Sequence, residues 1–174
     1  MKKSEILFLY ETSYNIPNGD PFTGEQRYDE ETKKILVSDV RIKRFIRTYL
    51  EDIEGEHIYV SEKTGAGKTD SKGVLTWIAQ NWNTNQKTDI AEIMKELIDV
   101  RLFGGISTLD KKMKVGEQEF VNGHVQFTGP VQFAALNPSL NRVNLRMHQN
   151  TSHFTSKDDK AQGAISTTTL VPYS

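Results

Sequence analysis

The chain has 174 residues, no cysteine, a formal net charge of −1 and a pI near 6.4. A hydrophobic content of 36% and a charged content of 26% are typical of a folded globular protein and argue against disorder. The lack of cysteine excludes a disulfide framework and thiolate metal sites, and the nearly neutral charge excludes nucleic-acid binding through bulk charge. We expect one cytoplasmic domain over residues 1–174, in which any nucleic acid is bound by a local basic patch.

The N-terminal segment carries an unbroken apolar run at residues 6–10. Such a run predicts a central β-strand over residues 5–12 that is buried on both faces. Five residues are too few for a signal-peptide core or a membrane helix, so we expect no membrane contact.

A turn-forming loop follows, because asparagine, proline, glycine and aspartate crowd residues 15–21. A helix is then predicted from Ser38, a favourable N-cap, to Ile53, and Gly55 is placed to end it. Helical spacing predicts that five apolar residues form one core-facing stripe: Ile42, Phe45, Ile46, Tyr49 and Ile53.

Four basic residues fall outside that stripe and fan across the opposite helix face: Arg41, Lys43, Arg44 and Arg47. Together with the unpaired N–H groups of the first turn, they could bind phosphates. From the pattern alone, an ordinary solvated basic face is the more frequent explanation.

Further elements are expected along the middle of the chain. Residues 58–60 form a short strand candidate, and residues 71–82 an amphipathic helix whose apolar stripe is Leu75, Ile78, Ala79 and Trp82. Trp77 lies off this stripe, and aromatic packing is favoured there over base stacking. A second core helix begins after Asp89, which has capping-box spacing to Glu92, and stops at Gly104 and Gly105.

The stretch T-G-A-G-K-T at residues 64–69 invites comparison with a phosphate-binding loop. That motif requires glycine where this chain has Glu62, and no long hydrophobic strand precedes it. We therefore expect a flexible polar loop.

The C-terminal third reads as β structure. A charged hairpin-like piece is expected at residues 110–119, and alternating strands at 125–128 and 131–134 are separated by a break at Gly129 and Pro130. The polar stretch 137–162 predicts a functional loop or projecting hairpin, and a threonine-rich strand follows at 166–171. Helices and strands in this order predict an α+β fold.

Catalytic and metal-binding patterns are weak. His124, His148 and His153 match no short ligand motif, and no Ser-His-Asp order or nucleophile elbow occurs. Asp20 and Asp29 are the remaining candidates, since a loop carboxylate near a phosphate can orient water or hold Mg²⁺. An Asx turn explains Asp20 without chemistry.

Several motifs together resemble one family. They are N-G-D-P at 18–21, R-Y-D-E-E-T at 27–32, V-S-D-V-R-I-K-R-F-I-R at 37–47, R-L-F-G-G at 101–105, G-P-V-Q-F at 129–133 and T-L-V-P-Y at 169–173. Their order and spacing are similar to the repeated backbone subunit of type I CRISPR surveillance complexes, the Cas-seven family, and fit its I-B branch best.

The resemblance implies a modified RRM-like (ferredoxin-like) palm with a helical fingers insertion and a projecting thumb hairpin. We expect the palm at about residues 1–54 and 100–140, the insertion at about 55–99 and the thumb at about 141–168. The chain covers about three-fifths of an ordinary family member, so the fold is expected to be incomplete at its C-terminal side.

The resemblance also implies a non-catalytic scaffold that oligomerises along a CRISPR guide RNA (crRNA) and presents it for pairing with target DNA. Neighbouring copies and other Cascade subunits are the implied partners, and neither cofactor nor metal is expected. The predicted RNA-binding residues are Asn18, Gly19, Asp20, Arg27, Ser38, Arg41, Lys43, Arg44, Arg47, Gly104, Gly105, Arg142 and Arg146.

Two alternatives remain open. A shortened copy could act as a decoy that binds crRNA or Cascade proteins and blocks assembly. Relatives in type III complexes cut RNA with a loop aspartate, so a metal-dependent RNA endonuclease is the third and least favoured hypothesis.

Overall fold

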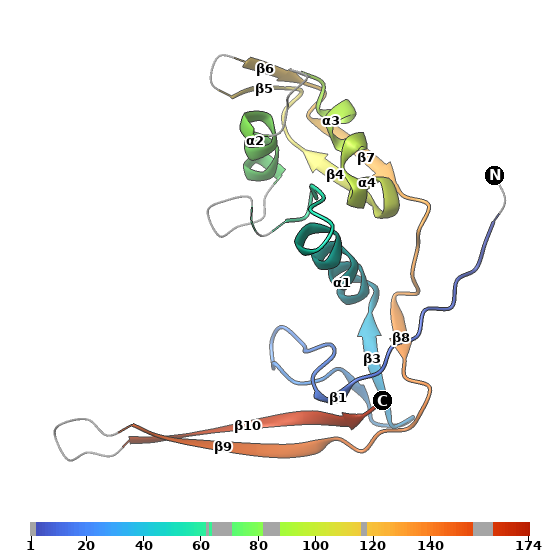
Figure 1. Ribbon diagram of the computed structural model, residues 1–174, viewed down its shortest axis with the longest axis vertical. Helices are drawn as coiled ribbons and strands as arrows, with labels where there is room; N and C mark the ends of the chain where they lie inside the picture. The colour runs from blue at the N-terminus through green and yellow to red at the C-terminus, as the bar shows by residue number, and fades with distance from the viewer. Residues whose placement is uncertain (1–2, 62, 64–70, 82–87, 116–117, 155–161) are drawn as a thin grey trace. The chain divides into compact units, whose positions relative to one another are not determined.

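The computed structural model describes residues 3–61, 63, 71–81, 88–115, 118–154 and 162–174 (Figure 1). Helices and small antiparallel sheets alternate along it, so the predicted α+β class is confirmed. The chain divides into two compact units, residues 1–41 with 134–174 and residues 42–133. The RRM-like arrangement and its palm, fingers and thumb boundaries stay predictions.

The first unit is built from two antiparallel three-stranded sheets. One has the order β1 (Ser13–Asn15), β10 (Gln162–Tyr173), β9 (Arg146–Phe154), and the other β2 (Tyr28–Asp29), β3 (Lys34–Ser38), β8 (Leu136–Pro138). A small core of Ile35, Val143 and Val171 lies between them, and Tyr28 donates a 2.6 Å hydrogen bond from its hydroxyl to the Val143 carbonyl. This hydrogen bond joins β2 to the connection before β9.

Strands β9 and β10 form the long hairpin that Figure 1 shows reaching away from β1. A hairpin was predicted in this region, and the strand expected at residues 166–171 is confirmed within β10. Strand β9 begins at Arg146, and the preceding Val143 is buried, with its amide donating to the Lys33 carbonyl.

The prediction of a buried N-terminal strand is wrong. Residues 3–12 belong to no strand, and Ile6 and Leu7 are 84% and 82% exposed. An apolar run forms a central strand only where neighbouring strands bond its backbone and other elements cover its faces. Neither condition is met for residues 6–9 in the described part of the chain.

Helix α1 (Asp39–Asp52) confirms the predicted helix, and Gly55, at φ +70°, ends it as expected. The predicted apolar stripe is only partly buried. Ile42 is buried, whereas Phe45, Tyr49 and Ile53 are 38%, 53% and 69% exposed. The helix instead turns part of its basic face toward the protein interior, where Arg47 pairs with Asp99.

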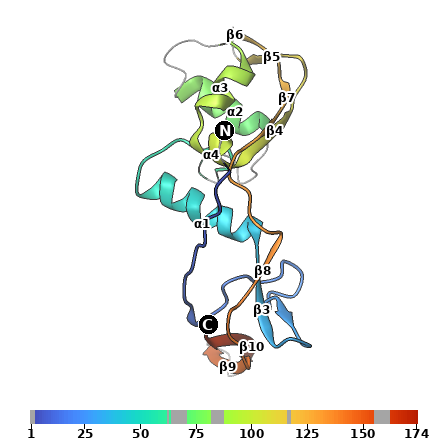
Figure 2. The same ribbon diagram turned by 90° about the vertical axis from the view of Figure 1, so that its right-hand side faces the viewer.

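The second unit packs helices against strand pairs. Its elements are α2 (Ser71–Asn81), α3 (Ile90–Glu96), α4 (Ile98–Phe103), β4 (Gly104–Thr108), β5 (Lys112–Val115), β6 (Gln118–Val121) and β7 (His124–Thr128). Helices α2, α3 and α4 lie on one side of the antiparallel β4–β7 pair (Figure 2). Their apolar faces form a core that includes Leu75, Ile78, Met94, Leu97 and Phe120.

Several local predictions are confirmed in this unit. Asp89 caps α3 by accepting from the Ala91 amide at 2.8 Å, and β5 and β6 form the charged hairpin. Trp77 packs against the core, 5.9 Å between ring centroids from His57, as expected for an aromatic packing residue. Residues 64–69 and Trp82 lie outside the described residues.

Three other predictions are wrong. The core helix is broken at Leu97, which is extended at ψ 125°, so α3 and α4 are separate. Residues 58–60 form no strand, because the Tyr59 and Val60 amides donate to the Asp99 carboxylate rather than to a neighbouring strand. Residues 131–134 also form no strand, since the Val131 amide is held by the Leu102 carbonyl.

Candidate nucleic-acid interface

Asn18 fastens the N-terminal loop to β3. It is 6% exposed. Its backbone N–H donates to Gln26 Oε1 at 3.0 Å, and its side-chain Oδ1 accepts from the backbone N–H of Ser38 at 2.7 Å. Gln26 in turn donates from Nε2 to the Arg27 and Leu36 carbonyls. The side chains of Asn18 and Gln26 thus replace backbone pairing inside the loop, and sequence reasoning missed Gln26 because glutamine has no characteristic turn pattern.

Asp20 holds the tip of the same loop. Its Oδ1 accepts from the Phe22 amide at 2.9 Å, which is the predicted Asx turn, and its Oδ2 lies 3.3 Å from Arg27 Nη2. Both side chains of this ion pair are about one-third exposed, at 36% and 31%, so the pair is partly open to solvent. Gly19 forms a β-bridge with Gln26, which brings Asn18, Gly19, Asp20 and Arg27 together.

The start of α1 joins this loop. Ser38 Oγ accepts from the Arg41 amide at 3.4 Å, and Arg41 Nε donates to the Pro17 carbonyl at 3.0 Å. The Asp39 amide donates to the Ala135 carbonyl. Two of the first-turn amides are therefore already used, so the predicted anion site of unpaired helix N–H groups is smaller than the sequence suggested.

Lys43 and Arg44, one turn further along α1, are half-buried. Lys43 Nζ lies 6.0 Å from the centroid of the Phe103 ring, a cation–π distance, and Arg44 Nη1 donates to the Val60 carbonyl at 3.2 Å. Both side chains therefore take part in contacts within the second unit.

Arg47 occupies a different environment. Its Nε lies 3.0 Å from Asp99 Oδ2, and the two side chains are only 11% and 1% exposed. Its guanidinium carbon also lies 5.2 Å from the Phe103 ring centroid. The prediction that all four basic residues fan across a solvent-facing side of α1 is therefore wrong for Arg47, because a buried carboxylate draws it inward.

Sequence reasoning missed Asp99. The one available signal was a single carboxylate within the otherwise apolar segment of residues 97–100. A charged group among core residues is costly to bury unless it is paired and hydrogen-bonded, so it indicates a buried partner somewhere in the chain.

Gly104 and Gly105 connect α4 to β4, directly after Phe103. Gly104 adopts φ +84°, and a Cβ there would lie 2.3 Å from the Phe127 carbonyl oxygen. A Cβ on Gly105 would press on Val100, Met94 and Tyr59. Both glycines thus serve close packing. The ring of the preceding residue, Phe103, lies beside Lys43 and Arg47.

Arg142 and Arg146 lie elsewhere in the first unit. Both are exposed, Arg142 in the connection before β9 and Arg146 at its start, where Nη1 donates to the Tyr14 hydroxyl at 3.3 Å. This hydrogen bond joins Arg146 to β1.

The second aspartate candidate for catalysis, Asp29, is also held in a turn. Its carboxylate accepts from the Thr32 hydroxyl at 2.7 Å and from the Glu31 and Thr32 amides. The Thr32 hydroxyl hydrogen bond is the main reason that the pKa of Asp29 is lowered, with the two amides adding to it. Across the described residues, no group of three histidine, aspartate or glutamate side chains is arranged to hold a metal ion.

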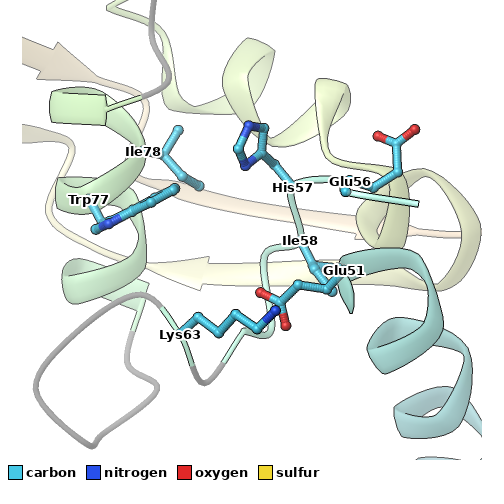
Figure 3. Close-up of a pocket in the computed structure, with 8 residues that line it drawn as sticks. Glu51, Glu56, His57, Ile58, Lys63, Trp77 and Ile78 are labelled. Atoms are coloured by element: carbon cyan, nitrogen blue, oxygen red, sulfur yellow. The ribbon is translucent and has the colours of Figure 1, made fainter. Parts of the chain in front are cut away.

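A cavity of about 210 Å³ lies in the second unit and is lined in part by Glu51, Glu56, His57, Lys63 and Trp77 (Figure 3). None of the predicted RNA-binding residues lines it. Glu51 accepts from the Ser61 hydroxyl, and Lys63 pairs with Asp52. Two glutamates on the wall disfavour a polyanionic ligand there.

Comparison with known proteins identifies the family. The family model described as CRISPR-associated protein Cas7 matches residues 2–174. This chain belongs to the Cas7 family. It is 29% identical over 153 residues to the CRISPR-associated protein Cas7 of Haloferax volcanii, a match that covers 82% of this chain and 44% of that protein.

The Cas7 assignment confirms the resemblance read from the motifs. The chain spans less than half the length of this curated Cas7 relative. None of the helices described in this Cas7 chain has the length and apolar character needed to cross a membrane.

Proposed function

We propose that this chain is a non-catalytic scaffold subunit that binds the sugar–phosphate backbone of crRNA in a type I Cascade. Its Cas7 membership supports a CRISPR role. The remaining support comes from the side chains around α1.

The observation that carries the proposal is the placement of three cations within four residues of α1. Arg41 adjoins the loop through the Pro17 carbonyl, and Lys43 and Arg44 follow two and three residues later in α1. The hydrogen bond from the Ser38 backbone amide to Asn18 Oδ1 fixes the loop at the start of the helix. A loop fixed against the Arg41 guanidinium suits a phosphodiester backbone, because fixed donors bind without further loss of conformational freedom.

Backbone contact without base contact is what a guide-RNA scaffold requires, since it must accept any spacer sequence. Asp20, Gly19 and Arg27 would shape the groove for the RNA, and Gly104 and Gly105 would let the RNA backbone approach closely. We assign Arg47 a supporting role, because its pair with Asp99 takes up its charge. Arg142 and Arg146, beside the hairpin, would contact RNA as part of a thumb.

The same proposal places the chain in the cytoplasm, in a type I-B complex, between neighbouring copies and other Cascade subunits, with target DNA reached through the crRNA. It needs no metal and no cofactor. Two contacts argue against the endonuclease hypothesis. The Asp20 and Asp29 carboxylates accept hydrogen bonds from turn amides, and Asp20 also pairs with Arg27. These contacts favour structural roles for both residues.

The test compares crRNA binding by the parent chain, the Lys43→Ala plus Arg44→Ala variant, and a Lys112→Ala plus Lys114→Ala control on β5. Both variants lose two positive charges, but only the first removes the proposed phosphate contacts. We expect the α1 variant to bind about tenfold more weakly, with a salt slope lower by about 1.4, since each single-strand phosphate contact contributes about 0.7. The control should change affinity less than about twofold.

Equal losses in the two variants would contradict the α1 assignment, because they would reflect net charge alone. Capture of a Cascade protein without any RNA, or stunted particles on mixing with full-length subunits, would instead favour the decoy. Mg²⁺-dependent RNA cleavage that is abolished by Asp20→Ala would favour the endonuclease.

A further inference from the structure

The segment of residues 8–14 carries three exposed aromatic side chains. Phe8, Tyr10 and Tyr14 are 57%, 42% and 64% exposed. The rings of Phe8 and Tyr10 lie together, with 6.0 Å between their centroids and 37° between their planes. All three residues belong to the first unit. Aromatic rings that no core covers are typical of interaction surfaces, so this segment is a candidate binding surface.

Tyr14 is held beside an arginine. Arg146 Nη1 donates to the Tyr14 hydroxyl at 3.3 Å, and both residues are exposed. Tyr14 also adopts φ +48°, a left-handed conformation that a bulky residue rarely takes. Residues in such conformations are concentrated at functional sites, which favours a direct ligand contact for Tyr14.

Tyr10 has an arginine of its own nearby. Partial burial raises the pKa of the Tyr10 hydroxyl above its ordinary value, and the positive charge of Arg41 offsets part of that rise. Arg41 is in turn fixed by the 3.0 Å hydrogen bond from its Nε to the Pro17 carbonyl. Each tyrosine is therefore accompanied by a guanidinium from another element, α1 for Tyr10 and β9 for Tyr14.

A ring beside a guanidinium suits a nucleotide, because the ring can stack on the base while the guanidinium binds the phosphate. We propose that Phe8, Tyr10 and Tyr14 form a surface on which unpaired bases of a single-stranded RNA stack. Arg41 and Arg146 bind the phosphates of the stacked nucleotides. This inference rests on the proposed crRNA binding and adds a second kind of contact, to the faces of the bases.

The charges on this surface favour RNA over an apolar protein partner. A protein that covered the rings with apolar side chains would also bury two guanidinium groups, which is costly unless each is paired. Stacking also suits a scaffold that accepts any spacer, because every base has a π-face and the contact is tolerant of sequence. It leaves the hydrogen-bonding edges of the bases open for pairing.

The test compares Tyr14→Leu with a matched variant, Tyr49→Leu. Tyr49 is 53% exposed and its hydroxyl donates to Glu54 at 2.7 Å, so both tyrosines are exposed and have a charged neighbour. Only Tyr14 has a cation there. Measured by fluorescence anisotropy, Tyr14→Leu and Tyr10→Leu should each weaken binding of a single-stranded RNA about tenfold, and Tyr49→Leu less than about twofold.

Three further measurements distinguish stacking from other causes. Tyr14→Phe keeps the ring and loses the hydroxyl, so it should bind RNA nearly as tightly as the parent chain. The leucine variants should keep the salt slope of the parent, because stacking neutralises no phosphate, whereas Lys43→Ala plus Arg44→Ala lowers that slope. An oligomer of equal length with abasic spacers has the same number of phosphates but no bases, so the parent should bind it about tenfold or more weakly.

Equal affinity of the parent for the RNA and the abasic oligomer would overturn the stacking surface and leave the proposed backbone binding intact. A loss in Tyr14→Phe as large as in Tyr14→Leu would also overturn it, because the hydroxyl rather than the ring would then be responsible. Equal losses in Tyr14→Leu and Tyr49→Leu would do the same. If the parent bound neither oligomer, the proposed function itself would fail, and this inference with it.

Discussion

Gly104 shows how a single backbone position controls the passage from α4 to β4. Its φ of +84° lies in the region that glycine alone adopts readily, and its amide closes the helix by donating to the Val100 carbonyl. An added Cβ would also lie 2.3 Å from the Phe127 carbonyl oxygen and 2.8 Å from the Gly129 nitrogen. Backbone strain and backbone collision therefore act together at this residue.

Gly24 is a matched control, because it has φ +73° but no atom within 4 Å of an added Cβ. We expect Gly24→Ala to lower the free energy of unfolding by about 1 kcal/mol, from left-handed strain alone. Gly104→Ala should lower it by about 3 kcal/mol or more, because β7 must also move. Urea denaturation followed by circular dichroism measures both, and equal losses would contradict the collision.

The sequence indicated a stop at Gly104 and Gly105 but could not separate the two roles. Gly105 has no positive φ, and its hydrogen instead leaves room for Val100, Met94 and Tyr59. The local sequence shows only that glycine occurs at these positions. Some of the atoms that require it belong to Phe127 and Tyr59, which are distant in the sequence.

At the scale of elements, Asp99 connects α4, residues 59–60 and α1. Its carboxylate accepts from the Tyr59 and Val60 amides at 2.8 Å and 3.1 Å and pairs with Arg47 at 3.0 Å. The helix break at Leu97 directs this carboxylate inward, where it also accepts from the Val100 amide. One side chain thus satisfies two amides that would otherwise need a strand partner.

Asp99→Asn tests this connection. The amide cannot neutralise Arg47, which is left buried and unpaired, so we expect the free energy of unfolding to fall by about 3–5 kcal/mol. The control is Asp52→Asn, which breaks the exposed pair with Lys63 and should cost about 0–1 kcal/mol. Thermal and urea denaturation of both variants measure the difference, and a loss at Asp99 as small as at Asp52 would rule out the buried pair.

Elements were predictable from the sequence where short-range signals agree. Helix α1 has Ser38 before it and Gly55 after it, so both of its ends were predicted closely. The Asp89 cap gave the start of α3 but not its end at Glu96. The failures share a long-range cause. Neither the bent path at Tyr59 nor the inward turn of Arg47 can be read without Asp99, which lies 40 and 52 positions away.

At the scale of the whole molecule, burial was harder to predict than secondary structure. Residues 6–9 and the Phe45 side of α1 have the pattern of core residues, yet remain open in the described chain. Periodicity identifies a face that is suited to burial but does not supply the surface that covers it. The candidate site followed the same rule. Arg41 contacts the loop through the Pro17 carbonyl, whereas Arg47 pairs with Asp99.

Net charge sets the final expectation for the molecule as a whole. At −1 the chain attracts a polyanion little at long range, so under the proposed function RNA affinity would arise from local phosphate contacts. Such contacts would carry no base information, because Arg41, Lys43 and Arg44 would reach phosphate oxygens rather than base edges. Affinity should then depend on the length of the RNA and the salt concentration, but not on spacer sequence.

Fluorescence anisotropy with two crRNAs of equal length and unrelated spacers measures this property. We expect dissociation constants within about twofold of each other and equal salt slopes, since both RNAs present the same phosphates. A duplex of the same length is the control for shape and should bind differently, because its phosphates follow a fixed helical path. A preference above about tenfold for one spacer would show that bases are read directly, and a scaffold that must hold any guide could not work in that way.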